Sequence, residues 1–427
     1  MKIIKEQNQI SQFLTNSNDF DSQLFDNVRN IIAMVESQSD RAVLDLTNKF
    51  DNTGFTDASE LKVSEEEFAA AENNLDEKVK SAIQNAYKRI ASYHEKQLPA
   101  DLKYKDETGV ELGNLWRSIQ KIGVYVPGGT ASYPSSVLMS AVPAIVAGVK
   151  DIVICTPSNQ GKVDDAVLYA AKICGIKDVF KVGGAQAVAA MAYGTQTIPK
   201  VDKIVGPGNS YVATAKKILY GVVGIDMIAG PTDLTIICDK SVDSRFVACD
   251  ALSQLEHGPD SKVFVITDSE DFAMTISADI DFYANQLSRK DIIQESLKNS
   301  AVILVDDLSE APEIANEIAP EHLEIMCEGG DKMVAQIQNA GAIFVGNYTP
   351  EPIGDYIAGP SHTLPTSGNA RFTSGLSVYD FLKRISLINC DQNAFEKLAD
   401  DAEVLAASEG FTAHELSVKI RRGGDDV

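Results

Sequence analysis

Four of the five histidines in this chain lie in short segments that also carry a carboxylate or a carboxamide. The segments hold Gln254 with Glu256 and His257, Glu321 with His322, Asp355 with His362, and Glu409 with His414. Histidine is the side chain that titrates closest to neutral pH, and it is also the commonest metal ligand. This placement predicts one site that combines metal binding with acid–base chemistry.

Gln254 and His257 lie three residues apart near the end of a predicted amphipathic helix over residues 246–255. Since a Gly-Pro pair follows directly, both side chains point to one side of the helix end. A carboxamide oxygen and an imidazole nitrogen there could bind one divalent cation, with Asp355 and His414 completing the set. Two nitrogen and two oxygen donors without cysteine suit zinc and would tolerate manganese or cobalt. The structural alternative is a helix end at which His257 caps free carbonyl groups and Gln254 faces water.

The adjacent pair Glu321 and His322 offers the residue types for acid–base catalysis. An imidazole accepts a proton near neutral pH, and a neighbouring carboxylate can activate water. The alternative is a helix start, with Pro320 in the first turn and Glu321 complementing the helix dipole.

Asp355 and His362 flank a stretch rich in proline and glycine, which predicts an irregular loop. Loops carry binding residues disproportionately, although solvated surface side chains are the alternative here. Glu409 and His414 bracket Gly410, where ordinary helix capping is the alternative.

The elements that must position these residues show two kinds of sequence pattern. Residues 20–100 follow a helical pattern that includes a long charged helix over 64–94, and His94 is predicted to be a solvated residue on that helix. From residue 120 onward, short β-branched runs alternate with helices, as in a parallel α/β sheet. The predicted strands are 122–126, 151–156, 178–182, 203–205 and 234–238, followed after Pro231 by a second pattern with strands at 262–267, 301–305 and 342–345.

Three glycine-rich turns follow predicted strands and open helices, where a nucleotide phosphate can approach backbone amides. They begin at Val126, Val182 and Val205, and none is a complete G-x-G-x-x-G fingerprint. Chain reversal is the alternative for each turn alone, but three of them together favour a nucleotide crevice.

The tail over residues 391–427 is predicted to form two helices divided at Gly410, with Thr412 and Glu415 as a capping box for the second. A tail with so little core of its own must dock elsewhere, for example on a partner subunit. The predicted fold class is α/β, with two Rossmann-like, incomplete doubly wound domains, a helical N-terminal lead-in and a small C-terminal helical tail.

The composition is that of a globular protein, with 427 residues, 44% hydrophobic residues and a net charge of −23. That charge disfavours nucleic acid and anionic membranes as partners, although a dinucleotide bound by backbone amides remains compatible with it. The chain shows no secretory signal and no apolar run long enough to span a membrane. The six separate cysteines are predicted to be buried thiols in a reducing compartment, so a cytoplasmic location is expected.

A set of seven ordered motifs resembles the histidinol dehydrogenase family over residues 20–421. The motifs are Tyr125-Val126-Pro127-Gly128-Gly129, Val182-Gly183-Gly184-Ala185-Gln186, Gly206-Pro207-Gly208-Asn209, Ala229-Gly230-Pro231, Ser253-Gln254-x-Glu256-His257-Gly258-Pro259, Pro320-Glu321-His322-Leu323 and Gly359-Pro360-Ser361-His362-x-Leu364-Pro365-Thr366. The resemblance implies a zinc-dependent, NAD-linked, four-electron oxidation of L-histidinol to L-histidine through L-histidinal, the last step of histidine biosynthesis. It also implies a homodimer with a shared active site, one zinc ion per subunit and a tail that docks on the partner subunit.

The resemblance assigns roles residue by residue. The implied zinc ligands are Gln254, His257, Asp355 and His414, and Glu321 and His322 would carry the acid–base chemistry. Substrate contacts would come from these ligands, His322, Thr232, His362 and Glu409. Tyr125, Gln186 and Asn209 would line the nucleotide site.

The resemblance also implies domain boundaries, and one segment departs from the family pattern. Residues 20–125 with 232–376 would form the first α/β domain, 126–231 the NAD-binding domain, 1–19 with 377–401 a small helical domain, and 402–427 the tail. Thr232 and Asp233 stand where the family most often has serine and glutamate, so Thr232 keeps the hydroxyl and adds a methyl group. Oxidation of another small alcohol and a non-catalytic zinc-binding or scaffold protein are the alternatives, and the carboxylate of Glu409 and the Glu321–His322 pair, respectively, argue against them.

Overall fold

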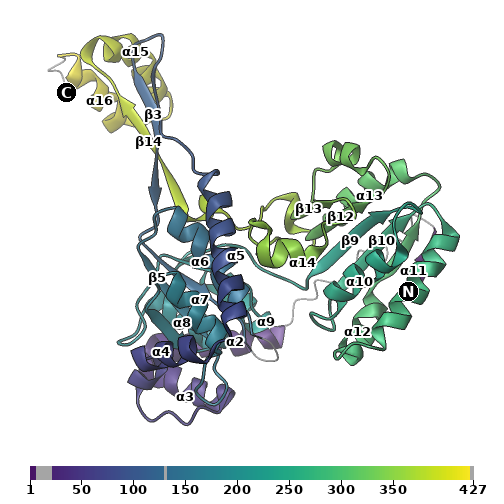
Figure 1. Cartoon of the computed structure of the whole chain (residues 1–427). Helices are drawn as coiled ribbons and strands as arrows, with labels where there is room; N and C mark the ends of the chain where they lie inside the picture. The colour runs from purple at the N-terminus through teal and green to yellow at the C-terminus, as the bar shows by residue number, and fades with distance from the viewer. Residues whose placement is uncertain (6–21, 129–131, 424–427) are drawn as a thin grey trace. The chain divides into compact units, whose positions relative to one another are not determined.

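The computed structural model describes residues 1–5, 22–128 and 132–423, and these form two compact units. Unit 1 consists of Met1–Gln97 and Ile119–Phe381, and unit 2 of Leu98–Ser118 and Leu382–Val427. Figure 1 shows the elements with the labels used below. Among the described residues, no helix is long and apolar enough to cross a membrane.

Unit 1 contains a five-stranded parallel sheet with the strand order β6-β5-β4-β7-β8. Its strands are β4 (Lys121–Tyr125), β5 (Asp151–Thr156), β6 (Asp178–Lys181), β7 (Lys203–Val205) and β8 (Gly224–Ile225). The chain builds outward from β4 to β6 and then returns to the other side of β4. A crevice at the carboxyl ends of β4 and β7 is therefore the expected ligand position in such a sheet.

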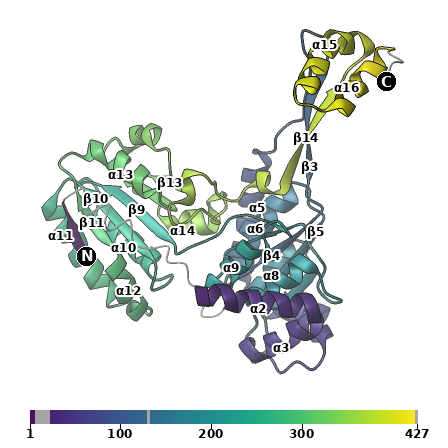
Figure 2. The same ribbon diagram turned by 180° about the vertical axis from the view of Figure 1, so that it is seen from behind.

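Helices from two parts of the chain pack on this sheet. Those between its strands are α6 (Pro134–Val146), α7 (Asp165–Ile173), α8 (Gly184–Tyr193) and α9 (Ser210–Leu219), and those before it are α2 (Ser22–Gln38), α3 (Asp40–Asp51), α4 (Glu65–Asn74) and α5 (Glu77–Glu95). The apolar face of α2 joins the core cluster of α8, α9 and the sheet (Figure 2). The buried valines and isoleucines of α2 pack against the alanine-rich helix α8.

The predicted helix over residues 64–94 is two helices, and His94 is buried rather than solvated. Asp76 caps the start of α5, where its Oδ1 accepts the backbone N–H of Lys78 at 2.7 Å, so a new helix begins at this position. His94 is fully buried, and its Nδ1 lies 2.8 Å from the Ile90 carbonyl oxygen. The prediction for His94 was wrong because a local hydrogen bond satisfies one ring nitrogen inside the protein.

Unit 1 also contains a six-stranded sheet that is parallel throughout, with the order β1-β11-β10-β9-β12-β13. Its strands are β1 (Lys2–Ile4), β9 (Asp233–Cys238), β10 (Lys262–Thr267), β11 (Ala301–Leu304), β12 (His322–Met326) and β13 (Ala342–Val345). The helices around it are α10 (Ser244–Leu255), α11 (Glu270–Ala284), α12 (Lys290–Ser296) and α13 (Ala311–Ile318). Strand β12 was not predicted, and the helix start considered for Glu321 is wrong because α13 already ends before Pro320.

Short helices complete unit 1 after its strands and loops. They are α14 (Glu351–Ile353), the π-helix η5 (Gly354–Ala358), and the 3₁₀ helices η1 (Ala58–Leu61), η2 (Leu297–Asn299), η3 (Leu308–Glu310), η4 (Gly330–Gln336), η6 (Asn369–Arg371) and η7 (Val378–Phe381). The parallel sheets with their covering helices confirm the predicted α/β class with two Rossmann-like halves.

Unit 2 is built from two distant segments of the chain. Its antiparallel sheet has the order β14-β3-β2, with β2 (Leu102–Lys105), β3 (Glu111–Ser118) and β14 (Leu382–Asn389), and the helices α15 (Gln392–Ser408) and α16 (Thr412–Arg421) follow. The division at Gly410 is confirmed, and that glycine has a φ of 75°. The predicted capping box is absent from the described α16, because Phe411 occupies the N-cap position and Thr412 is already inside the helix.

The cysteines only partly follow the prediction of buried thiols. Cys155 and Cys238 are buried in the two parallel sheets, whereas Cys249 and Cys390 are exposed. Cys249 lies on α10 and Cys390 directly follows β14, positions at which a small side chain can face solvent.

Candidate functional site

A cluster of ionisable side chains lies at the amino ends of β9 and β12. These strands are neighbours, with His322 paired to Leu234, so Glu321 lies beside Asp233. The backbone N–H of Glu321 donates to the Asp233 carboxylate at 3.0 Å, and the Thr232 hydroxyl lies 2.5 Å from Glu321 Oε2. The starts of the two strands therefore hold the carboxylate of Glu321 against Thr232 and Asp233.

Helix α10 brings Gln254 and His257 to the same edge of the sheet. The helix returns antiparallel to β9, so its C-terminal end lies near the strand starts. Gln254 is fully buried, and its carboxamide lies between the Thr232 hydroxyl, 2.6 Å away, and the Glu351 carboxylate. With Nε2 toward Thr232, the carboxamide oxygen faces Glu351, whereas the opposite amide orientation lets Nε2 donate to both Glu351 oxygens at 2.7 and 2.9 Å.

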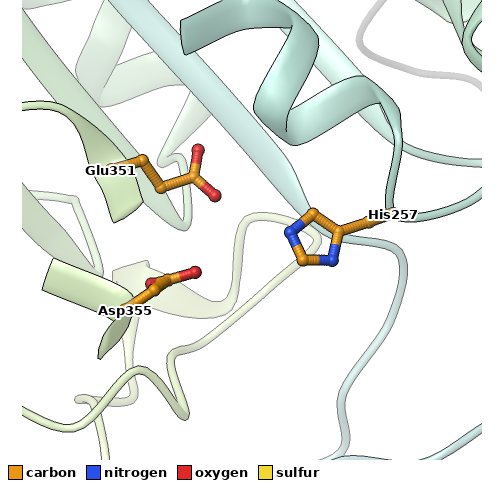
Figure 3. Close-up of side chains that lie close together, drawn as sticks. All are labelled: His257, Glu351 and Asp355. Carbon is orange, nitrogen blue, oxygen red and sulfur yellow. The ribbon is translucent and has the colours of Figure 1, made fainter. Parts of the chain in front are cut away.

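His257, Glu351 and Asp355 offer ligand atoms that all lie within 4.8 Å of one another. Figure 3 shows the two carboxylates and the imidazole turned toward a common space. Glu351 comes from α14 and Asp355 from the π-helix one turn later. One nitrogen and two carboxylate donors at this spacing, with the Gln254 carboxamide adjacent, match the donor types that zinc takes in proteins.

Glu324 fixes the position of Glu351 in this cluster. It lies in the middle of β12, fully surrounded by protein, and its Oε1 accepts the Glu351 backbone N–H at 2.8 Å. A carboxylate in a central strand thereby orients the start of α14, and with it the carboxylate of Glu351.

Burial and crowding shift the proton affinities of these groups. Burial raises the pKa of Glu321 to about 7 and that of Glu351 to about 8. Burial alone would lower the pKa of His322, but the neighbouring Glu351 and Glu321 carboxylates raise it well above its usual value. Asp355 Oδ1 lies 3.4 Å from His322 Nε2, and this contact holds the pKa of Asp355 below its usual value despite burial. Such a concentration of perturbed groups is typical of an active site.

His362 lies near the same cluster. Burial lowers its pKa, while the nearby Asp355 carboxylate and an Asp355 backbone contact act in the opposite direction. The predicted loop between Asp355 and His362 begins as the π-helix, a form that is frequent at functional sites.

A second feature of unit 1 is a pocket of about 1150 Å³ at the carboxyl ends of β4, β5 and β6. Tyr125, Gln186 and Asn209 all line it. The Tyr125 hydroxyl accepts the Gly184 backbone N–H at 3.0 Å, and Asn209 caps α9 by accepting the N–H groups of Tyr211 and Val212 at 3.1 and 3.2 Å. Of the first glycine-rich turn, Gly129 and the two residues after it lie outside the described residues.

Comparisons with known proteins agree along the whole chain. The profile of a protein family described as histidinol dehydrogenase matches residues 14–422. The chain belongs to the histidinol dehydrogenase family. It is 48% identical over 410 residues to histidinol dehydrogenase from Agrobacterium fabrum, which covers 96% of this chain and 95% of the relative. It is 47% identical over 396 residues to that from Aquifex aeolicus, with 92% of each chain covered.

A solved structure of a family member has nearly the same fold. The histidinol dehydrogenase from Elizabethkingia anophelis superposes with a TM-score of 0.94 at 36% sequence identity, covering 99% of this chain and 97% of that one. The chain is therefore an enzyme of the histidinol dehydrogenase family, and its fold is the family fold.

Within this family member, the structure brings most of the predicted site residues together. Thr232, Gln254, His257, Glu321, His322, Asp355 and His362 gather at one edge of the six-stranded sheet. Glu409 and His414 lie in unit 2, where both line a hollow on α15 and α16 with Leu405 and Val418.

Sequence reasoning missed three members of the cluster: Asp233, Glu324 and Glu351. In the sequence, Asp233 was noted only because the family most often has glutamate at that position. Burial raises its pKa to about 6. Glu351 stands four residues before Asp355, a spacing that places both on one side of a helical turn. That spacing could have identified Glu351, whereas a short irregular loop was predicted there.

Proposed function

We propose that this chain catalyses the zinc-dependent, NAD-linked, four-electron oxidation of L-histidinol to L-histidine through L-histidinal. Family membership supports histidinol oxidation in histidine biosynthesis as the activity. The observation that carries the finer proposal is the buried Glu321–His322 pair beside a cluster of donors that suits a metal. The alternative of a fold without catalysis offers no reason for burying both groups, because each costs free energy when desolvated.

Gln254, His257 and Asp355, with His414 from the resemblance, are the proposed zinc ligands. The buried carboxamide and the close approach of His257 to Asp355 and Glu351 support a cation there, because two carboxylates so near each other favour neutralisation. Zinc bound there would act as a Lewis acid that anchors the amine and the imidazole of histidinol. The proposal retains the homodimer with a shared active site that the resemblance implies.

His322 is the proposed acceptor of the alcohol proton. Once the neutral ring has accepted the proton, Asp355 Oδ1, which lies 3.4 Å from His322 Nε2, would stabilise the imidazolium. The strand pairing of β12 with β9 and β13 holds the backbone of His322 on both sides. NAD is the proposed hydride acceptor in both oxidation steps.

Glu321 is the proposed base that activates water for hydration of the aldehyde. A buried carboxyl group with a pKa of about 7 is partly ionised at neutral pH, which suits it to accept and return a proton. When Gln254 presents its oxygen to the Glu351 side, Nε2 donates to Thr232, whose single hydroxyl hydrogen then points to Glu321. This orientation favours the ionised form of Glu321, so Thr232 links the proposed metal ligand to the proposed base.

The pocket of the five-stranded sheet is the proposed NAD site. Tyr125, Gln186 and Asn209 line it at the carboxyl ends of the strands, the position at which open α/β sheets bind nucleotides. Gly128 and Gly183 also line the pocket, and a Cβ atom at either position would lie 2.7 Å from Pro157, so the close packing of these two turns requires glycine. His362 and, in unit 2, Glu409 are the proposed contacts to the substrate imidazole and amine.

The test is the stoichiometry of NADH formation with L-histidinol. Two equivalents of NADH per histidinol are expected, whereas one equivalent with free aldehyde would reject the four-electron proposal. A panel of other small alcohols separates this activity from the alternative, and a clear preference for an alcohol without imidazole would favour that alternative.

Two variants test the assigned roles. Glu321→Gln and His322→Asn are expected to abolish turnover while bound zinc, measured by elemental analysis, stays at the wild-type level. Asp239→Asn, a change of one carboxylate away from the cluster near the other end of β9, is a control that should retain activity. Unchanged activity in either cluster variant would contradict the roles.

A further inference from the structure

The π-helix η5, which carries Asp355, packs closely on β13 at its start. Gly354 is its first residue, and its backbone lies so close to the ring of Phe344 on β13 that no room remains for a Cβ atom. Phe344 in turn lies beside His322, with ring centroids 5.8 Å apart. Close packing therefore fixes the start of the π-helix next to the cluster.

The end of the same π-helix meets α5. Arg89 on α5 donates from Nε to the Ile357 carbonyl oxygen at 2.6 Å and from an Nη atom to the Ala358 carbonyl oxygen at 3.2 Å. Gly359 follows with a φ of 131°, and a Cβ atom there would lie 3.0 Å from the Tyr93 Cβ atom and 3.3 Å from the Arg89 carbonyl oxygen. One face of α5 therefore supplies both the guanidinium and the surface on which Gly359 packs.

These hydrogen bonds suit arginine in particular. The last carbonyl groups of a helix have no partner within the helix and carry a partial negative charge. A guanidinium presents several N–H groups in a rigid, planar fork, which fits two neighbouring oxygen atoms, whereas lysine offers a point charge on a flexible stem. Arg89 is an exposed residue, so its contribution to the molecule lies in these contacts more than in core packing.

The position of the π-helix decides where the Asp355 carboxylate lies. Its ligand atom and those of His257 and Glu351 all lie within 4.8 Å of one another, and its Oδ1 lies 3.4 Å from His322 Nε2 (Figure 3). A metal site needs its donors held within about 0.5 Å of the productive geometry. A π-helix is a rare form, found mostly as a single turn, so the contacts that keep it in place matter for the site.

We propose that Arg89 is a positioning residue for the metal site: it holds the end of the π-helix so that Asp355 points at the cation. This inference rests on the proposed function, because it takes Asp355 to be a zinc ligand. Arg89 acts through the backbone of the π-helix and not by contact with the cation. Helix α5 packs on α6 and α7, so the guanidinium is carried by an element that is itself held in place.

Arg89→Met is the test, because methionine keeps much of the aliphatic stem and removes the N–H donors. Affinity for Zn²⁺ should fall about ten- to hundredfold, the usual effect of losing a group that orients a metal ligand. It is measured by competition with a chelator, at a temperature at which circular dichroism shows the variant folded. Arg89→Lys keeps the charge and can donate to one carbonyl group, so its affinity should lie between those of Arg89→Met and the wild type.

The kinetics give a second readout. In Arg89→Met, kcat should be low when Zn²⁺ is limiting and should recover when Zn²⁺ is in excess, because the reacting groups themselves are unchanged. Wild-type Zn²⁺ affinity in Arg89→Met would overturn the positioning role, and so would a lower melting temperature without a change in that affinity.

Two further variants separate the possible failures. Lys88→Met is the matched control, since it removes an exposed cation from the neighbouring position of α5 and should keep wild-type Zn²⁺ affinity. Asp355→Ala should lose Zn²⁺ affinity. If it does and Arg89→Met does not, the role of Arg89 alone is refuted. If Asp355→Ala binds Zn²⁺ like the wild type, the proposed ligand is refuted, and the role of Arg89 with it.

Discussion

Replacing Lys216 by methionine is expected to destabilise the five-stranded half of unit 1 by about 3–5 kcal/mol, the usual effect of removing one partner from a buried ion pair. Lys216 on α9 and Asp226 form such a pair, with side chains 3% and 0% exposed. The Lys216 ammonium also donates to the Gly206 carbonyl oxygen at 3.1 Å, and Asp226 accepts the Gly206 N–H at 2.8 Å. The pair therefore holds both backbone groups of the turn that leads from β7 to α9.

The magnitude follows from what methionine leaves behind. Its side chain fills nearly the same volume, so packing is retained, but the Asp226 carboxylate stays buried without its cation. The double variant Lys216→Met with Asp226→Leu should recover part of the loss, because no charge remains buried. Lys172→Met is the control: its ion pair with Glu72 is 43% and 44% exposed, and its loss should cost less than about 1 kcal/mol.

Urea unfolding followed by circular dichroism measures the free energy of unfolding of each variant. Hydrogen exchange of peptides covering residues 203–219 shows whether the loss is local to β7 and α9, and KM for NAD should rise because Asn209 follows this turn. If Lys216→Met lowers the free energy of unfolding by less than about 1 kcal/mol, the reasoning is refuted, because the buried pair would then contribute no more than an exposed ion pair does.

Four further outcomes are expected. The turnover number should fall as the pH drops through about 7, because protonation removes the carboxylate that we propose as the base, that of Glu321; a rate independent of pH between 6 and 8, on the order of one unit either side of that value, would contradict this. Thr232→Val should lower kcat about tenfold, because it removes the hydroxyl that links Gln254 to Glu321, whereas Thr232→Ser should keep the wild-type kcat. The pH profile of kcat is measured for both variants, and equal kcat values and profiles would contradict the link. His257→Ala should lower zinc affinity at least about a hundredfold in competition with a chelator, while equal affinity would remove His257 from the proposed ligand set. Gly206→Ala should unfold at a lower temperature by calorimetry, because its φ of 109° is strained for alanine and a Cβ atom would lie 2.1 Å from the Tyr125 carbonyl oxygen; an unchanged melting temperature would refute that.

Several short strands bounded by clear turns could be predicted from the sequence, whereas the buried strand β12 could not. The limits of β5 and β10 match the predicted ranges 151–156 and 262–267. In β12 the charged residues His322 and Glu324 interrupt the apolar run, although both are buried. Polar residues of the candidate site interrupt the apolar pattern by which a buried strand is recognised, so β12 could not be identified from the sequence.

The residue types of the site could be predicted, but the edge of the sheet on which they meet could not. Strand ends were expected to bind ligands at their carboxyl side, as the pocket near Tyr125 does. Glu321 and Asp233 instead lie at the starts of their strands. Gln254 and His257 reach the same edge because α10 returns its C-terminal end to it. Such a meeting depends on tertiary packing of residues far apart in the sequence. The burial of His94 was missed for the same reason, since its partners come from the folded environment.

The two-segment construction of unit 2 has a consequence for synthesis and folding of the chain. Strand β3 pairs with β14 along eight residues, from Leu382 with Ser118 to Asn389 with Glu111. These contacts close a very long loop, and such contacts form late because the entropy of closure must be met first. Among the described strands, β3 can pair only with the short β2 during translation until β14 emerges from the ribosome. The helices that carry Glu409 and His414 are therefore among the last parts of the enzyme to acquire their folded surroundings.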